Sequence, residues 1–373
     1  MHKRSMKHAT VVITGATSGI GRAIAMEFAA AKANLVLAAR NEDNLRDIVQ
    51  ECIRQGAHAV SVPTDVSELD AMEKLAAMAE AAFEGPIAVW INNAGIGTFG
   101  EFSETPLEAH VQVVKTNLIG YMNGCFAVLP YFKKARTGVI INMNSSGAFV
   151  PMPFASGYSA SKFGLLGFME ALRGELIHDT NIHVCDIYPY FVNTPGFRHA
   201  GNYMGVTLKP LPLTIESEVV AQAVFALAQS PRAQTTLGWP TYAARVAYTL
   251  FPGLTRSLTG QFLRAYFQTA VPSPQTEGTI FESKREIGRS SGTPSAVAHL
   301  PALKPLVSKP MILGAAGLAA VGLGVFLATR SKSRAKLSGK MKSEIDDPSV
   351  RTLSENDDYP LYERLQGSQI AKA

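Results

Sequence analysis

Residues 10–28 read TVVITGATSGIGRAIAMEF, and this stretch decides the fold. The apolar run Ala9–Thr14 is typical of a buried strand, and Gly21–Ala31 is typical of a helix. In the glycine-rich turn between them, a Cβ atom would keep a phosphate group away from the backbone. The N-terminus of the following helix offers unpaired N–H groups and the positive end of a dipole. The turn therefore predicts a dinucleotide site, against the alternative of a tight turn without a ligand. The candidate contacts are Gly15, Thr17, Ser18, Gly19, Ile20 and Gly21.

Outward from this turn, short apolar runs alternate with longer helical stretches as far as about residue 240. Near-continuous apolar strands spaced by helices indicate a parallel sheet that is covered on both faces. Residues 1–240 are therefore expected to form an α/β domain, a doubly wound, Rossmann-type parallel sheet of about seven strands with helices on both faces. The other expected strands are Asn34–Ala39, His58–Pro63, Ile87–Ile91, Gly138–Met143, Ile182–Ile187 and Gln234–Leu237, and the expected helices include Glu42–Gln55, Glu68–Phe83 and Tyr158–His178.

The composition argues against several classes of protein. Apolar residues make up 47% of the 373 residues and charged residues 17%, which does not suggest a disordered chain. The three cysteines are far apart and form no C-x-x-C pair, so we expect neither a disulfide framework nor a metal site. No apolar leader segment precedes the first strand, so no secretory signal is expected. The basic residues form no recognisable nucleic-acid motif, so we expect no nucleic-acid partner.

The end of the second expected strand indicates which dinucleotide binds. A site for NAD usually places an acid here, which binds the ribose 2′-hydroxyl and would repel a 2′-phosphate. This sequence has alanine at that place, followed by Arg40. An arginine can donate two hydrogen bonds to one phosphate group. We therefore expect NADP(H), with Arg40 at the 2′-phosphate; the alternative is a solvated surface arginine.

Several further motifs occur in order along residues 8–240. They are Asp65-Val66, Asn92-Asn93-Ala94-Gly95, Asn117, Ser145, Tyr158-Ser159-Ala160-Ser161-Lys162 and the segment from Pro189 to Thr194. In this order and spacing the chain resembles the short-chain dehydrogenase/reductase family in its common single-domain form. The resemblance implies an NADP(H)-dependent oxidoreductase that interconverts a carbonyl and an alcohol and forms a homodimer or homotetramer. It also implies cofactor contacts from Asp65, Val66, Asn93, Ala94, Gly95, Tyr158, Lys162, Val192 and Thr194.

The resemblance implies that Asn117, Ser145, Tyr158 and Lys162 are catalytic. When a hydride reaches a carbonyl carbon, a proton must reach its oxygen, and Tyr158 is the expected donor. Tyr158 and Lys162 are four residues apart and share one face of a helix. A lysine charge about 4 Å from a phenol is worth roughly 4 kcal/mol, so we expect Lys162 to lower the pKa of Tyr158 toward neutrality. Ser145 is expected to bind the substrate oxygen, and Asn117 to hold a water that links Lys162 to solvent.

Two features leave alternatives open. Taken singly, Tyr158 could pack in the core, Ser145 could cap the end of a strand and Asn117 could bridge a turn. The sequence also departs from the family's P-G-x-x-x-T segment, because Tyr190 stands where the family has glycine. This bulky residue is expected to reshape the substrate pocket. The alternative function is a membrane-attached NADP(H)-binding scaffold or redox sensor without turnover.

The sequence changes character after residue 240. Residues 241–270 combine aromatic residues with arginines, contain no acid and are divided by Pro252-Gly253 into two helical pieces. They fit either a pair of helices that covers the pocket or an interfacial anchor that lets apolar substrates enter from lipid. Residues 271–310 are rich in Pro, Ser and Gly and are expected to form a linker.

Residues 311–329 are a candidate transmembrane or membrane-associated helix. Met311–Ala328 contains no charge and would extend over roughly 27 Å as a helix. The tail, residues 330–373, begins with a basic run and then becomes polar. A surface-bound helix, a hairpin and a buried or disordered tail are the alternatives. We therefore expect a membrane-associated protein whose catalytic domain faces the cytoplasm, and a small hydrophobic substrate such as a steroid, a retinoid or a long-chain acyl carbonyl.

Overall fold

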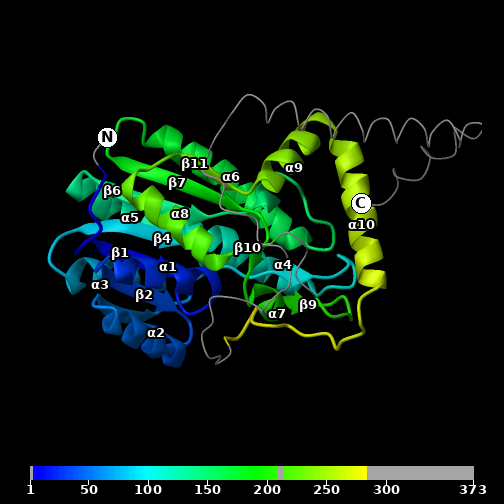
Figure 1. Cartoon of the computed structure of the whole chain (residues 1–373), viewed down its shortest axis with the longest axis horizontal. Helices are drawn as coiled ribbons and strands as arrows, with labels where there is room; N and C mark the ends of the chain where they lie inside the picture. The colour runs from blue at the N-terminus through cyan, green and yellow to red at the C-terminus, as the bar shows by residue number, and fades with distance from the viewer. Residues whose placement is uncertain (1–2, 209–213, 284–373) are drawn as a thin grey trace, which may run out of the picture. The chain divides into compact units, whose positions relative to one another are not determined.

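The computed structural model describes residues 3–208 and 214–283 (Figure 1). Its centre is a seven-stranded sheet in which all neighbouring strands are parallel. The strand order β11-β7-β6-β4-β1-β2-β3 means that the chain winds first to one side of β1 and then to the other. This confirms the doubly wound α/β fold that the sequence predicts. The strands are β1 (Thr10–Thr14), β2 (Asn34–Ala39), β3 (His58–Pro63), β4 (Ile87–Asn92), β6 (Gly138–Met143), β7 (Ile182–Pro189) and β11 (Gln234–Leu237).

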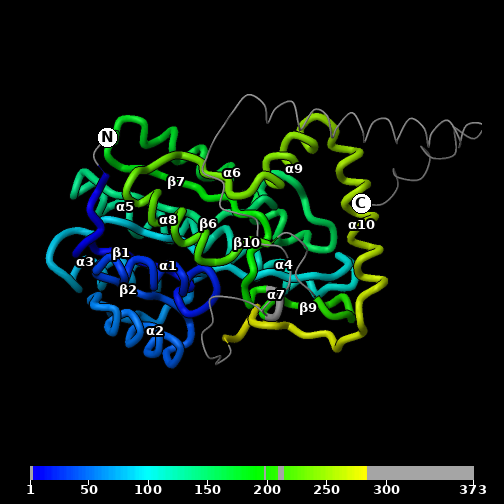
Figure 2. The backbone as a smooth tube through the Cα atoms, viewed as in Figure 1, coloured from blue at the N-terminus to red at the C-terminus, as the bar shows by residue number. Residues whose placement is uncertain are grey.

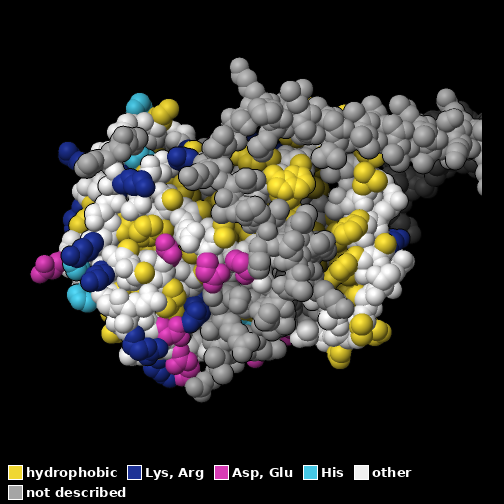
Figure 3. All heavy atoms as spheres, in the orientation of Figure 1, with side chains coloured by type: hydrophobic (Ala, Val, Ile, Leu, Met, Phe, Trp, Pro, Cys, Tyr) yellow, Lys and Arg dark blue, Asp and Glu magenta, His cyan; other side chains and the backbone are white. Residues whose placement is uncertain are grey.

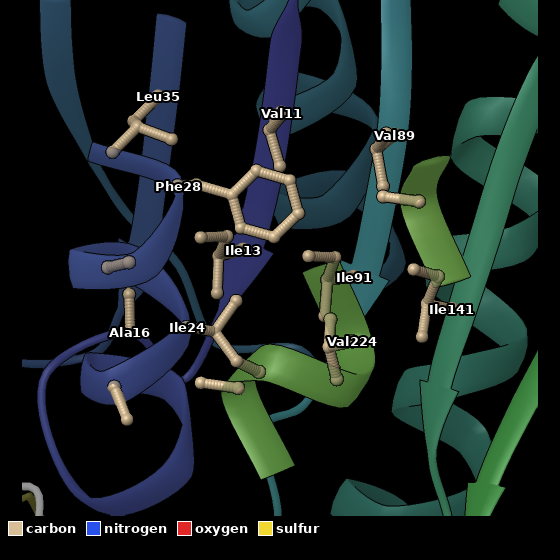
Figure 4. Close-up of a cluster of buried hydrophobic side chains, with 14 of the residues drawn as sticks. Val11, Ile13, Ala16, Ile24, Phe28, Leu35, Val89, Ile91, Ile141 and Val224 are labelled. Carbon is tan, nitrogen blue, oxygen red and sulfur yellow. The ribbon is translucent and has the colours of Figure 1, made fainter. Parts of the chain in front are cut away.

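The strands place apolar side chains in two cores, one on each face of the sheet. Successive residues of a strand point to opposite faces, so Val11 and Ile13 enter one core and Val12 enters the other. Figure 4 shows the first core, where Phe28 and Val224 lie over the side chains of the strands. The first core is covered by α1 (Gly19–Ala30), α2 (Glu42–Arg54) and α8 (Ser217–Gln229), and the second by α3 (Leu69–Ala82), α5 (Gly120–Ala135) and α6 (Ser156–Glu175).

Local chemistry explains where α2 begins. The Asn41 side chain accepts a hydrogen bond of 2.9 Å from the backbone N–H of Asn44, which caps the helix. Glu42 and Asp43 in the first turn also favour the positive end of the helix dipole. The remaining short elements are β5 (Thr98–Phe99), α4 (Leu107–Val114), a π-helix (Lys115–Ile119), a 3₁₀ helix (Ser146–Ala148), β8 (Val192–Asn193), α7 (Gly196–His199), β9 (Gly201–Asn202) and β10 (Ile215–Glu216).

Two helices and a returning segment follow the sheet. α9 (Trp239–Leu250) and α10 (Pro252–Gln268) are the two helical pieces that Pro252-Gly253 predicts. Figure 2 shows the yellow chain after α10 running back past β9 and α7. Residues 271–283, which we call the strap, therefore differ from the expected linker. They are packed on the domain, because Thr276 pairs with Asn202 and the Ile280 side chain is fully buried.

No helix within residues 3–208 and 214–283 is both long enough and apolar enough to cross a bilayer. The candidate membrane segment at 311–329, the tail at 330–373 and the rest of the expected linker lie outside the described residues.

Candidate active site

One cavity lies at the carboxyl ends of the strands, where the direction of winding changes between β1 and β4. Such a switch point is the usual ligand site of a doubly wound sheet. Every candidate site residue from the sequence analysis lines this cavity, although these residues come from segments that are far apart in the chain. The fold therefore brings the whole candidate set together.

Steric contacts require glycine in the turn after β1. Gly15 and Gly19 have φ angles of +65° and +51°, in the left-handed region that disfavours a side chain. A Cβ atom on Gly21 would lie 2.1 Å from the carbonyl oxygen of Gly15. Ser18 at the N-cap of α1 makes no side-chain capping hydrogen bond. An anion in the cavity can therefore approach the first N–H groups of α1 closely.

The Asn93 side chain fastens this turn to β4. Its Nδ2 donates to the carbonyl oxygens of Thr14 at 3.0 Å and Gly15 at 3.2 Å. Its backbone N–H donates to Thr14 Oγ1 at 3.0 Å. Asn93 lines the cavity as expected, but the structure also shows that it holds the shape of the glycine turn, which the sequence did not indicate.

Arg40 is bound by the strap. Its Nη2 donates to the carbonyl oxygen of Thr279 at 2.6 Å, and its Nη1 donates to that of Phe281 at 3.0 Å. Nη1 also reaches the carbonyl oxygen of Ile280 at 3.4 Å. The alternative of a solvated surface arginine is therefore wrong. Because Arg40 and Thr279 both line the cavity, the strap forms part of its wall.

Asp65 and Val66 form a fixed part of the cavity wall. The Asp65 carboxylate accepts hydrogen bonds from the backbone N–H of Ser67 at 2.9 Å and from its hydroxyl at 2.7 Å. The Val66 carbonyl oxygen accepts from Asn123 Nδ2 at 3.0 Å. A Cβ atom on Gly120 would lie 2.7 Å from the Val66 side chain, so α5 packs closely against this corner.

Ser145 and Tyr158 meet at the cavity. Ser145 follows β6 and caps the 3₁₀ helix, where its Oγ accepts a hydrogen bond of 3.1 Å from the Gly147 N–H. Tyr158 lies in the first turn of α6 and lines the same cavity as Ser145. A Cβ atom on Gly147 would come within 3.2 Å of the Tyr158 ring. The same atom would lie 3.5 Å from Ser145 Oγ, so Ser145 caps the turn after the strand and lies close to the expected proton donor.

Lys162 lies one helical turn after Tyr158 and is buried. Its Nζ donates a hydrogen bond of 2.8 Å to the carbonyl oxygen of Met143, at the end of β6. The same Nζ lies 5.0 Å from the centroid of the Tyr121 ring and 5.9 Å from that of Tyr158. The helix, the neighbouring ring and the strand end thus fix the ammonium group beside the phenol.

Burial has the largest effect on the pKa values of Lys162 and Tyr158. It lowers the pKa of Lys162 to about 7, against the opposing effect of the Asp186 carboxylate. It raises the pKa of Tyr158, while the hydrogen bond with Ser145 acts in the other direction. The expectation that Lys162 lowers the pKa of Tyr158 toward neutrality is therefore wrong for this structure. Removing both groups from water disfavours their charged forms more than their interaction favours them.

The Asn117 side chain braces the loop after β4. Its Oδ1 accepts from the Ile96 N–H at 2.9 Å, and its Nδ2 donates to the Ile96 carbonyl oxygen at 2.8 Å and to Ser161 Oγ at 3.3 Å. Both the oxygen and the nitrogen of the amide therefore form hydrogen bonds with protein atoms. This differs from the expectation that Asn117 holds a water molecule. Asn117 lies in the π-helix, an irregularity that is frequent at functional sites.

The loop after β7 connects the two ends of the cavity. Tyr190 lines the cavity and packs edge-on against Phe191, with 4.9 Å between ring centroids. Its backbone N–H donates to the Leu237 carbonyl oxygen at 3.3 Å. At the far end of the loop, a Cβ atom on Gly19 would lie 3.4 Å from Thr194 Cβ. The loop therefore still reaches the glycine turn with Tyr190 in place of glycine.

Three groups that act on Lys162 are not predicted from the sequence. The Met143 carbonyl oxygen and the Tyr121 ring contact its ammonium group, and Tyr121 also donates to that carbonyl at 3.0 Å. Asp186 is fully buried on β7 and accepts from Arg173 at 3.1 Å. Asp186 could have been noticed in the sequence, because an acid within the apolar run of β7 is expected to be buried and a buried charge needs a partner. A backbone carbonyl leaves no signal in a sequence.

The chemistry of the cavity suits a dinucleotide. The glycine turn admits a group close to the backbone at the N-terminus of α1. Arg40 supplies a positive charge, and Asp65 and the backbone of residues 93–95 line the same cavity. No group of His, Cys, Asp or Glu side chains within the described residues could hold a metal ion.

Comparison with known proteins identifies the family. Residues 9–202 match the family model described as short chain dehydrogenase. The uncharacterized oxidoreductase YxnA of Bacillus subtilis is 30% identical over 288 residues, which cover 75% of this chain and 80% of that protein. The dehydrogenase/reductase SDR family member 7B of Bos taurus is 32% identical over 259 residues, which cover 67% of this chain and 79% of that protein.

Two solved structures share the fold. An alcohol dehydrogenase from the archaeon Thermococcus sibiricus, complexed with 5-hydroxy-NADP, matches with a TM-score of 0.54 and 25% identity over 61% of this chain and 95% of that one. A metagenomic short-chain oxidoreductase in complex with NADP matches with a TM-score of 0.52 and 30% identity over 63% of this chain and 97% of that one. The chain is therefore an oxidoreductase, and it belongs to the short-chain dehydrogenase/reductase family.

Proposed function

We propose that this chain is an NADP(H)-dependent oxidoreductase that interconverts a carbonyl and an alcohol on a hydrophobic substrate. One observation carries the proposal: Ser145, Tyr158 and the buried Lys162 line the same cavity as the glycine turn. Carbonyl reduction needs a proton donor and a dinucleotide site next to each other, and this cavity is lined by residues suited to both.

The roles of the three side chains follow from their contacts. When bound, the nicotinamide nucleotide supplies or accepts the hydride. Tyr158 transfers its phenolic proton to the substrate oxygen, and its raised pKa keeps the phenol protonated before transfer. Ser145 donates a hydrogen bond to the same oxygen as negative charge develops there. Lys162, with a pKa of about 7, can gain or lose a proton near neutral pH beside the Tyr158 ring.

Three observations support NADP(H) as the cofactor. Ala39 ends β2 at the cavity and Arg40 follows it, so no acid stands at this place. The hydrogen bonds of Arg40 to the strap come from Nη1 and Nη2, and no described residue engages its Nε. A guanidinium carries more N–H donors than these bonds use, so Arg40 can bind the strap and a 2′-phosphate together. The two solved relatives hold NADP or 5-hydroxy-NADP.

The lining of the cavity supports a hydrophobic substrate. Among the other residues that line the cavity are four large apolar or aromatic side chains, Phe99, Met152, Tyr190 and Phe191. Such side chains favour apolar groups, since burying apolar area is worth about 25 cal/mol per Å². A steroid, retinoid or long-chain ketone therefore suits the cavity better than a sugar.

The test is NADPH oxidation by the full chain with two panels of carbonyl compounds. One panel contains long-chain and polycyclic ketones, and the other contains small polar sugars. We expect NADPH to be consumed with the apolar panel, and consumption to be lost in Tyr158→Phe but kept in Tyr242→Phe. Tyr242 is a matched control because it is exposed on α9 and does not line the cavity.

The outcomes separate the proposal from its alternatives. Faster turnover of the sugars would refute the hydrophobic substrate. NADPH binding without turnover of any compound in either panel would favour the scaffold or redox sensor. Equal use of NADH and NADPH would refute the assigned role of Arg40.

A further inference from the structure

Exposed apolar side chains lie along one face of α9 and along one face of α10. On α9, Trp239, Tyr242, Val246 and Leu250 are between 41% and 63% exposed. Their spacing of three and four residues places them on one face of the helix. Amphipathic helices normally bury this face, yet here it points away from the domain. The exposed stripe of α9 is therefore available to a partner.

The second helix continues this surface. On α10, Leu258 and Phe262 are 58% and 55% exposed, and Phe251 between the two helices is also exposed. The residues that α10 does bury, Leu263 and Phe267, lie on a different face. Figure 3 shows yellow side chains along α9 and α10. We call the exposed apolar residues of α9 and α10, together with Phe251, the apolar ridge.

The segment that carries the apolar ridge contains basic residues and no acidic ones. No Asp or Glu occurs between residues 219 and 276. Arg245, Arg256 and Arg264 are exposed on the two helices. Arg245 lies over the Phe149 ring at 4.2 Å and is near Glu170, whereas no acid of the described residues forms an ion pair with Arg256 or Arg264. An apolar stripe flanked by arginines and aromatic residues suits an anionic lipid surface.

The two helices also contact the substrate end of the cavity. Phe267 of α10 packs edge-on against Phe154, with 5.3 Å between centroids, in the loop that includes the cavity residue Met152. A Cβ atom on Gly238, which precedes α9, would lie 3.6 Å from Tyr190 Cβ. The helical segment that carries the apolar ridge therefore packs, through its buried face, on a loop that contributes to the cavity.

We propose that the apolar ridge docks on an anionic lipid surface, with its apolar side chains inserted among the acyl chains. A second copy of this chain is the main competing partner. A two-fold interface built on the ridge would bring the arginines of both copies together, and the ridge segment, residues 219–276, contains no acid to pair them. An anionic lipid surface supplies the missing negative charge. Lipid docking requires neither cofactor nor turnover, so it can be tested independently of the proposed reaction.

Tryptophan fluorescence tests this docking directly. The chain has two tryptophans: Trp239 lies on the ridge, and Trp90 is fully buried in the sheet. The full chain is mixed with vesicles of phosphatidylserine and brominated phosphatidylcholine, since bromine atoms on the acyl chains quench nearby tryptophans. We expect Trp239 to be quenched and its emission to shift to the blue. The Trp239→Phe variant should sediment with the vesicles but show no quenching of Trp90.

A triple variant measures how much the ridge contributes to binding. Because a single buried Leu or Phe contributes enough to change affinity severalfold, Leu250→Asn/Leu258→Asn/Phe262→Asn should lower vesicle affinity by at least about tenfold. Raising the salt concentration should weaken binding of the wild type, because salt screens the arginines. Binding should also fall when uncharged vesicles replace anionic ones.

The matched control carries the same substitution at exposed apolar residues elsewhere, Ile53→Asn/Met78→Asn/Ile177→Asn. It should bind vesicles as the wild type does. Sedimentation with vesicles without quenching of Trp239 would overturn the proposal, because another segment would then carry the binding. Concentration-dependent self-association that buries Trp239 in the absence of lipid would assign the ridge to a second copy instead. Equal vesicle affinity of the triple variant and the control would also overturn it.

Discussion

The guanidinium of Arg40 donates a hydrogen bond of 2.6 Å to the carbonyl oxygen of Thr279, which lies 239 positions further along the chain. This contact ties the strap to the end of β2, at the wall of the cavity. The strap is held on its other side by Asn202 and His199, which bond the backbone of Thr276 and Thr279. A segment beyond residues 9–202, which match the family model, thus contributes to the wall of the cavity.

Arg40→Ala is expected to weaken NADPH binding while leaving NADH binding nearly unchanged. A hydrogen bond to a charged group contributes about 1.5–3 kcal/mol, so the preference for NADPH should fall roughly ten- to hundredfold. Nucleotide titration followed by fluorescence measures both affinities. Arg46→Ala is the control, because that side chain is largely exposed and pairs with Asp43 away from the cavity. An unchanged nucleotide preference in Arg40→Ala would remove Arg40 from the cofactor site.

Lys162→Met is expected to change how stability depends on pH. Burial lowers the pKa of Lys162 from 10.5 to about 7 in the folded chain. Between these values the unfolded chain holds more protons than the folded one, so the free energy of unfolding of the wild type rises with pH. Lys162→Met lacks this contribution and should be more stable than the wild type below about pH 7. Urea unfolding at a series of pH values measures the difference.

The exposed Lys74 provides the control for this comparison, and Lys74→Met should keep the pH dependence of the wild type. Identical slopes of stability against pH in the wild type and in Lys162→Met would mean that Lys162 is not desolvated as described.

Gly21→Ala is expected to weaken both folding and nucleotide binding. The new Cβ would lie 2.1 Å from the Gly15 carbonyl oxygen and 2.5 Å from Asn93 Nδ2, so the turn must shift. Overpacking of this kind costs about 1–3 kcal/mol. Gly174→Ala tests the same substitution in α6, where no atom lies within 4 Å of the new Cβ. It should stabilise the chain by about 0.5–1 kcal/mol. Equal nucleotide affinity in the two variants would argue against the steric account of the turn.

Tyr190→Ala is expected to change substrate choice rather than the reaction itself. Removing the ring opens the cavity beside Phe191. Larger ketones gain room and smaller ones lose a contact, so the ratio of kcat/KM for a large and a small ketone should rise by about tenfold. Tyr242→Ala should leave this ratio unchanged. If Tyr190→Ala lowers kcat for all ketones equally, Tyr190 instead positions the reacting groups.

The sequence predicts the sheet well because its signals are local and repeated. Most strands of the sheet are apolar runs between turn residues, and the predicted bounds of β2, β3, β6 and β11 match those in the structure. The site residues could be named because their order and spacing resemble a family. The fold then places all of them on one cavity.

The rest of the site depends on contacts between distant residues. The strap resembles a linker in composition, and only its backbone carbonyls meet Arg40. The raised pKa of Tyr158 depends on burial, which spacing along a helix does not reveal. Asn117 has the expected place, but its partner is the Ile96 backbone. In each case the sequence identifies a site residue, but the contacts and burial of that residue depend on the three-dimensional fold.

The most direct test of the account is hydride transfer in Tyr158→Phe. NADPH carrying deuterium at the transferred position is mixed with the full chain and a long-chain ketone, and deuterium in the product alcohol is measured. We expect deuterium on the carbinol carbon with the wild type. Tyr158→Phe should still bind NADPH but transfer at least about a hundredfold less, the usual contribution of a positioned proton donor. Transfer by Tyr158→Phe at the wild-type rate would contradict the central claim that Tyr158 is the proton donor of this cavity.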